Sequence, residues 1–149
     1  MMKRLLPVIL LLLCSAVYAQ DLGLFQKKTF AFNGRDLQYR ILFPENYDAG
    51  KKYPLVLFLH GAGERGGDNE KQLTHGAKLF LADSNRKKFP AIVIFPQCPT
   101  DSSWGSLKVD RTKTPYSFSF DYTMPQTWAM QAVINMVKQV ATTEKVDKK

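Results

Sequence analysis

Residues 53–67 read YPLVLFLHGAGERGG, and this stretch decides how the rest of the chain is organised. Its apolar part, Leu55–Leu59, is short and continuous, which is typical of a central parallel strand covered by helices on both faces. Four glycines follow His60 within seven residues. A buried strand that runs into a glycine-rich loop is how an α/β fold presents backbone N–H groups at the carboxyl end of its sheet.

The glycine-rich loop has the pattern of an anion-binding loop. Residues 61–66 match G-x-G-x-x-G formally, but Glu64 would bring negative charge towards a pyrophosphate, and no strand with a terminal acidic residue follows about 20 residues on. The chain also has no G-K-[ST] sequence, which a P-loop requires. A His-Gly pair at the end of an apolar strand favours an oxyanion hole. The remaining alternative is a tight turn without chemistry.

An antiparallel hairpin is predicted before this stretch. Asn33-Gly34 separates Gln26–Phe32 from Arg35–Phe43 and supplies the positive φ values of a type I′ turn. In the second segment apolar and polar residues alternate, as in a half-buried strand. A hairpin that leads into a buried strand is how a mixed sheet with an antiparallel edge begins.

A βαβ unit and a further helix are predicted after the glycine-rich loop. We expect a helix over Glu70–Leu81, a solvated turn at residues 86–88 and a second buried strand over Ala91–Phe95. Two buried strands separated by a helix make a right-handed βαβ unit. Another helix is predicted over Pro125–Thr142, opened by a capping box at Thr123. The predicted fold class is α/β.

The segment between the second strand and the last helix, residues 97–121, is irregular and rich in aromatic residues. Tyr116, Phe118 and Phe120 alternate with serines, which indicates a short strand or an aromatic lid. Because the segment follows the carboxyl end of a strand, it should lie on the same rim as the glycine-rich loop. One interpretation is a substrate rim that includes Trp104, Tyr116 and Phe118; the other is a small satellite core.

The amino terminus has the pattern of a secretory signal peptide. Within residues 1–19, Lys3-Arg4 gives a positive start, Leu5–Leu13 an apolar segment too short to span a bilayer comfortably, and Ala19 a cleavage position. We therefore expect residues 20–149 to be secreted or periplasmic, without a stable membrane anchor.

Charge and metal-ligand content exclude some functions. The net charge of +8 is spread over short pairs of basic residues, which is typical of a solvated surface and argues against nucleic-acid binding. The chain has two His, and only Cys98 remains after signal-peptide cleavage. This composition argues against a zinc site or an internal disulfide. No metal or other cofactor is predicted.

Two motifs together resemble a known family. His60–Gly66, reading HGAGERG, and Phe95–Pro99, reading FPQCP, with Trp104 nearby, resemble the secreted α/β-hydrolase esterases. The type is the phospholipase/carboxylesterase and polyhydroxybutyrate-depolymerase-like one, related to dienelactone hydrolases and the prolyl oligopeptidase catalytic domain. The resemblance covers roughly residues 37–147. It implies the amino-terminal part of an α/β-hydrolase sheet.

The resemblance also implies an oxyanion hole in the glycine-rich loop. We place its backbone N–H at Ala62, with Gly61 and Gly63 as neighbours. In the family a G-x-S-x-G nucleophile follows, and then Asp and His. No G-x-S-x-G occurs in this chain, and His60 and His75 both precede the expected nucleophile. None of the catalytic triad is therefore present, and His60 is expected to orient its loop.

Our hypothesis is that residues 20–149 are the amino-terminal portion of a secreted serine hydrolase, truncated before the nucleophile and inactive as given. The complete protein would act on a small-molecule or polymeric ester, or on a peptide bond as in the prolyl oligopeptidase relatives. The alternative is a secreted, non-catalytic binding module derived from the same fold. The sequence leaves open whether the chain is a fragment or a natural truncation.

Overall fold

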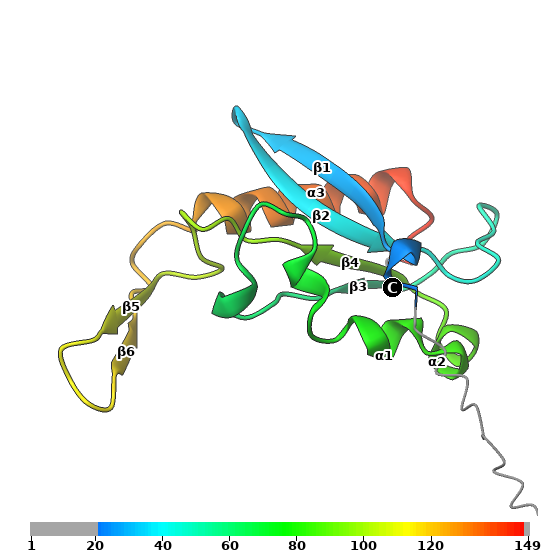
Figure 1. Ribbon diagram of the computed structural model, residues 1–149. Coiled ribbons are helices and arrows are strands. Elements are labelled where there is room, and N and C mark those ends of the chain that lie inside the picture. Colours follow the sequence, from blue (N-terminus) through cyan, green and yellow to red (C-terminus); the bar gives the residue numbers. More distant parts are fainter. Residues whose placement is uncertain (1–20, 148–149) are drawn as a thin grey trace, which may run out of the picture.

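The computed structural model describes residues 21–147, which form a four-stranded sheet with helices on both faces and a separate two-stranded hairpin (Figure 1). The signal peptide predicted for residues 1–19 lies outside the described residues. In spatial order the strands of the sheet are β1 (Gln26–Phe32), β2 (Arg35–Leu42), β4 (Ile92–Pro96) and β3 (Leu55–Leu57). The pairs β1–β2 and β2–β4 are antiparallel, and β3–β4 is parallel. The predicted α/β fold class is confirmed.

Helices lie on both faces of the sheet. The long helix α3 covers one face, and the short helices α1 and α2 lie on the other (Figure 1). The α-helices are α1 (Ala77–Leu81), α2 (Asp83–Lys88) and α3 (Trp128–Thr143). Three short 3₁₀ helices complete the described chain: η1 (Leu22–Leu24), η2 (Ala62–Glu64) and η3 (Lys71–Leu73). The hairpin of β5 (Leu107–Asp110) and β6 (Ser117–Phe120) projects away from the sheet.

The turn between β1 and β2 lies where the sequence predicts it. Asn33 and Gly34 have φ values of 51° and 74°, and Phe32 pairs with Arg35 across the turn. Both turn residues are thus in the left-handed region that a type I′ turn requires. The turn chemistry is local, so this element could be predicted from two residues.

Strand β4 is the core of the sheet, because it is buried along its whole length. Ile92 and Ile94 belong to the apolar cluster beneath α3, with Val133 and Met136. The alternate residues, Val93 and Phe95, belong to the cluster on the α1 side, with Ala77, Leu81 and Phe25. Successive side chains of a strand point to opposite faces, so one short strand joins both cores.

The position of β3 differs from the prediction of a central strand buried on both faces. The strand covers only Leu55–Leu57, and its one neighbour over these residues is β4. Leu57 is 37% exposed as a result. Just before β3, Tyr53 exchanges backbone hydrogen bonds with Lys145 and Asp147 and forms a parallel bridge to Val146. Beyond that bridge, no strand among residues 21–147 pairs with the outer edge of β3.

The single helix predicted over Glu70–Leu81 is wrong, because the segment is broken in the middle. It consists of η3, a turn at Gly76, and α1. Gly76 has a φ of +83°, and a Cβ on this residue would lie 2.7 Å from the ring of Phe58. The close approach to Phe58 therefore requires a backbone that ends one helix and starts another. Residues 86–88, predicted as a turn, lie in α2.

The last helix starts later than predicted. It begins at Trp128, with Thr127 as N-cap, whose hydroxyl accepts a hydrogen bond from the Met130 N–H at 3.2 Å. The same hydroxyl donates to the carbonyl of Ser103 at 2.6 Å. Thr123, the predicted cap, bonds Asp121 instead. The helix therefore begins where Thr127 can also bond Ser103, a contact distant in the sequence that the local capping pattern does not reveal.

Candidate functional site

A cleft of about 820 Å³ opens beyond the carboxyl ends of β3 and β4. One wall is the glycine-rich loop, and another is the hairpin β5–β6. Its floor includes two aromatic residues, Trp104 and Trp128. The residues that line the cleft include Gly61, Ala62, Arg65, Asp101, Trp104, Leu107, Val109, Arg111, Phe120 and Trp128. In open α/β sheets this edge is where ligands bind.

His60 fixes the start of the glycine-rich loop, and both of its ring nitrogens form hydrogen bonds. The backbone N–H of Cys98 donates to Nε2 of His60 at 2.9 Å, so Nε2 carries no proton. The proton is therefore on Nδ1, which donates to the carbonyl of Gly61 at 2.6 Å. Trp104 donates from its indole N–H to the carbonyl of His60 at 3.0 Å. His60 is a positioning residue, tied both to the segment that follows β4 and to Trp104 of the cleft.

Gln97, at the end of β4, holds the far part of the same loop. Its Oε1 accepts from the N–H of Asn69 at 2.7 Å, and its Nε2 donates to Asp68 Oδ1 at 2.7 Å and to the carbonyl of Glu64 at 3.3 Å. The N–H of Gly66 donates to the carbonyl of Cys98, the residue after Gln97, at 3.0 Å. Gln97 is 1% exposed. The loop is thus attached at both ends to the segment that follows β4, which pre-organises it.

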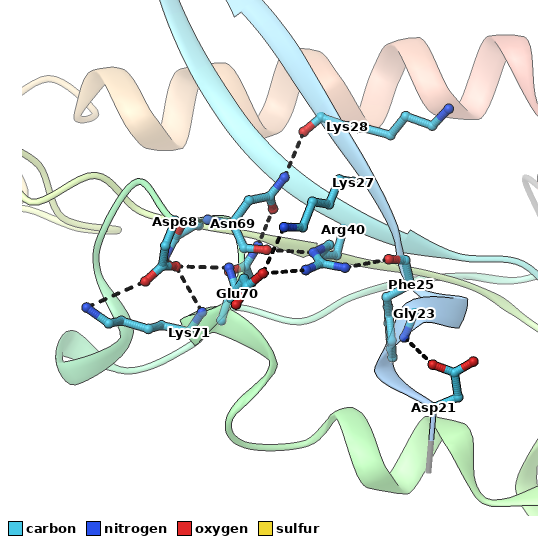
Figure 2. A network of polar contacts seen from close by, with 12 residues as sticks. Asp21, Gly23, Phe25, Lys27, Lys28, Arg40, Asp68, Asn69, Glu70 and Lys71 are labelled. Atoms are coloured by element: carbon cyan, nitrogen blue, oxygen red, sulfur yellow. Dashed lines mark hydrogen bonds and ion pairs between the residues drawn. The ribbon is translucent and has the colours of Figure 1, made fainter. Parts of the chain in front are cut away.

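Behind the loop, Arg40 of β2 joins it to the start of the described chain (Figure 2). The guanidinium donates to the carbonyl of Asn69 at 2.6 Å and to that of Phe25 at 2.7 Å. It also lies 3.8 Å from Glu70, which pairs with Lys27 at 2.8 Å. Arg40 is 7% exposed. A buried guanidinium with two carbonyl acceptors fixes where the loop ends.

Asp68, at the end of the loop, accepts hydrogen bonds from the backbone that leads into η3 (Figure 2). Its Oδ1 accepts from the backbone N–H groups of Glu70 at 2.9 Å and Lys71 at 3.0 Å, in addition to Gln97. The N–H of Lys71, followed by the amide of Gln97, holds the pKa of Asp68 well below its usual range. The carboxylate is therefore charged at neutral pH, and it is used for structure.

Comparison with known proteins agrees with this geometry. No family model matches the chain, and no curated protein matches it. Among solved structures the chain is similar to a thermostable esterase, at 32% sequence identity and a TM-score of 0.70. The fold is α/β-hydrolase-like. The similarity covers 85% of this chain and 32% of the esterase, so the chain spans about a third of that protein's length.

Within this α/β-hydrolase-like fold, the predicted oxyanion residues lie beside the cleft. Gly61 and Ala62 line it, and Gly63 follows in η2. Ala62 and Gly63 are the first residues of a 3₁₀ helix, so their N–H groups have no acceptor within that helix. The loop for which an oxyanion role is predicted thus lies at the carboxyl ends of β3 and β4, and the role itself stays a prediction.

The residues predicted as the substrate rim are divided by the structure. Trp104 lines the cleft. Tyr116 and Phe118 lie on the projecting hairpin, 55% and 63% exposed, and do not line the cleft. Two further residues line the cleft without having been predicted from the sequence: Trp128, at the start of α3, and Arg111, after β5. A signal existed for Trp128, since it lies at the amino end of a predicted helix that follows the rim segment.

The side chains around the cleft do not form a nucleophile–base pair in the part of the chain that the structure describes. The hydroxyls of Ser103 and Thr127 donate to backbone carbonyls, at 2.6 Å each. The His75 side chain is 74% exposed and lies 3.5 Å from Glu64. Among residues 21–147 no group of three or more His, Cys, Asp or Glu could hold a metal ion.

Cys98 lines the cleft but is not an activated nucleophile. Its side chain is buried. Burial raises the pKa of the thiol to about 11, although the nearby guanidinium of Arg65 opposes this shift. The thiol is therefore protonated at neutral pH, and a thiol in that form is a poor nucleophile.

In the described part of the chain, no helix is long and apolar enough to cross a membrane.

Proposed function

We propose that this chain forms the oxyanion-hole part of a secreted serine esterase. The observation that carries the proposal is the glycine-rich loop, fixed through His60 and Gln97 to the segment that follows β4, with Ala62 beside the cleft. The similarity to a thermostable esterase supports it. In acyl transfer such a loop donates an N–H to the negative charge that develops on the carbonyl oxygen.

The nucleophile would come from elements other than those described. In esterases of this kind a Ser attacks the carbonyl, a His takes its proton, and an Asp orients the His. The outer edge of β3, which no described strand covers, lies next to the parallel bridge between Tyr53 and Val146, and this supports a further parallel strand at that position. We propose that such a strand leads to the nucleophile, and that the 149 residues alone do not hydrolyse esters.

The inactivity of the chain alone can be measured directly. The 149-residue chain should not release p-nitrophenol from p-nitrophenyl acetate faster than a boiled control, and a fluorophosphonate probe should not label it. The physical reason is that neither described His lies beside a Ser hydroxyl. Stoichiometric labelling of one Ser, abolished when that Ser alone is replaced, would contradict this part of the proposal.

A test of the oxyanion role requires an active protein. Such a protein can be made by joining this chain to the part of an esterase that follows the region similar to this chain. Ala62→Pro then removes only the N–H, because Ala62 is the first residue of η2, where Pro is tolerated. The preceding Gly61 already has the extended backbone that a residue before Pro adopts. We expect kcat to fall by about 10²–10³, whereas the control Ala62→Ser keeps the N–H and the rate.

Three outcomes separate the alternatives. Equal rates for Ala62→Pro and Ala62→Ser would place the oxyanion donor elsewhere. A reading frame that continues after Lys149 and encodes Gly-x-Ser-x-Gly would support the truncated-esterase hypothesis. A genuine stop codon after Lys149 would favour the non-catalytic binding module.

We also propose that the protein is exported. The positively charged start and the apolar segment of residues 1–19 support this proposal. Expressed in a Gram-negative host, the product should be periplasmic and begin at Gln20. Amino-terminal sequencing that finds Met1 on a soluble cytoplasmic product would contradict export and leave the esterase proposal unaffected.

A further inference from the structure

The hairpin β5–β6 has one apolar and one polar face. Its register pairs Leu107 with Phe120 and Val109 with Phe118. Because side chains alternate along a strand, these four residues share one face, and Lys108, Asp110, Ser117 and Ser119 share the other. Leu107, Val109 and Phe120 line the cleft, so the apolar face is the one turned towards it.

The charged residues of this hairpin are paired, with one exception. Lys108 lies 3.1 Å from Asp121, and Lys113 lies 3.4 Å from Asp110. Arg111 lines the cleft and has no hydrogen-bond or ion-pair partner among the residues that the structure describes. It continues the alternation of Leu107 and Val109, which explains why it lies on the cleft side.

The other charges of the cleft leave this guanidinium available. Arg65 donates to the carbonyls of Ala62 at 3.2 Å and Ser102 at 3.1 Å, so it is held in the wall. Asp101, the acidic residue of the lining, lies 3.4 Å from Arg35, which is stacked over the ring of Trp128. The negative charge is thus already paired, and the net charge of the lining is positive.

We infer that the cleft takes esters whose apolar part carries a carboxylate, and that Arg111 binds this carboxylate. The apolar part would lie against Trp104, Trp128 and Phe120. A guanidinium pairs with a carboxylate through two parallel hydrogen bonds, which fixes orientation as well as charge. This inference rests on the proposed esterase function, since it names the class of substrate for the same site.

Binding can be tested on the full 149-residue chain without catalysis. The sequence contains two Trp, and both Trp104 and Trp128 line the cleft, so intrinsic fluorescence reports on it directly. The probes are phenylacetate and its uncharged isostere, phenylacetamide. We expect both to change the fluorescence and phenylacetate to bind about three- to tenfold more tightly, with the difference decreasing as salt is added.

Matched variants assign that difference to one residue. Arg111→Gln should make the two dissociation constants equal and leave phenylacetamide binding unchanged. Lys113→Gln, which removes a positive charge of the same hairpin outside the cleft, should keep the preference. Equal binding of both probes to the unmodified chain, or a preference that survives in Arg111→Gln, would overturn the inference and leave the proposed function standing. No binding of either probe would count against the proposed function as well.

Discussion

Replacing Arg40 by Met is expected to lower the free energy of unfolding by about 2–6 kcal/mol. The guanidinium is buried, and it is the donor to the carbonyls of Asn69 and Phe25. A Met side chain fills similar space but donates no hydrogen bond, so two buried acceptors lose their partner at about 1–3 kcal/mol each. The measurement is the urea concentration at which pulse proteolysis digests half of the protein, which is the midpoint of unfolding.

Lys27 offers a matched control for Arg40. The two residues are direct partners across β1 and β2, and both lie near Glu70. Lys27 is exposed, so its ion pair is screened by water, and Lys27→Met should cost at most about 1 kcal/mol. Equal effects of the two substitutions would show that charge, and not the buried hydrogen bonds, gives Arg40 its role.

Gly76→Ala should have the second largest effect, about 2–4 kcal/mol. A residue with a Cβ is strained at the φ of +83°, and the new atom would lie 2.7 Å from the Phe58 ring. That ring cannot retreat easily, because it stacks on Phe95 at 4.5 Å and contacts Phe80. The same proteolysis assay, with thermal unfolding followed by circular dichroism, measures the loss.

The control for Gly76 is Gly67→Ala. A Cβ added to Gly67 would have no heavy atom within 4 Å beyond its chain neighbours, and the residue has no positive φ. Its substitution should change stability by less than about 0.5 kcal/mol. If both glycine variants were equally stable, the break between η3 and α1 would not depend on the backbone of Gly76.

The parts of the fold that could be predicted from the sequence are those decided by neighbouring residues. Asn33-Gly34 specifies its turn by itself. The continuous apolar run of β4 predicts a strand buried on both faces. The break at Gly76 could not be predicted, because its cause is the ring of Phe58, eighteen positions earlier in the sequence. The edge position of β3 depends in the same way on which strand lies beside it.

The part of the candidate site formed by the glycine-rich motif could be predicted from the sequence. The part that depends on how β5 pairs with β6 could not. The glycine-rich loop and the segment that contains Trp104 both come after the carboxyl end of a predicted strand, so the sequence predicts that they share one rim. Arg111 and Phe120 reach the cleft because Leu107 pairs with Phe120, and a one-residue shift in this register would turn them away. The alternation of aromatic residues alone could not predict that Phe120, and not Phe118, lines the cleft.

The attachment of the glycine-rich loop has a consequence for protein engineering. His60 and Gly66 are bonded to Cys98, and Asn69 is bonded to Gln97, so the loop is held against the segment that follows β4. None of these bonds uses the outer edge of β3. A polypeptide divided along that edge would keep the glycine-rich loop intact on one of its two pieces. For the esterase function proposed above, such a division suits a split reporter, in which a colour reaction starts only when two fused partners bring the pieces together.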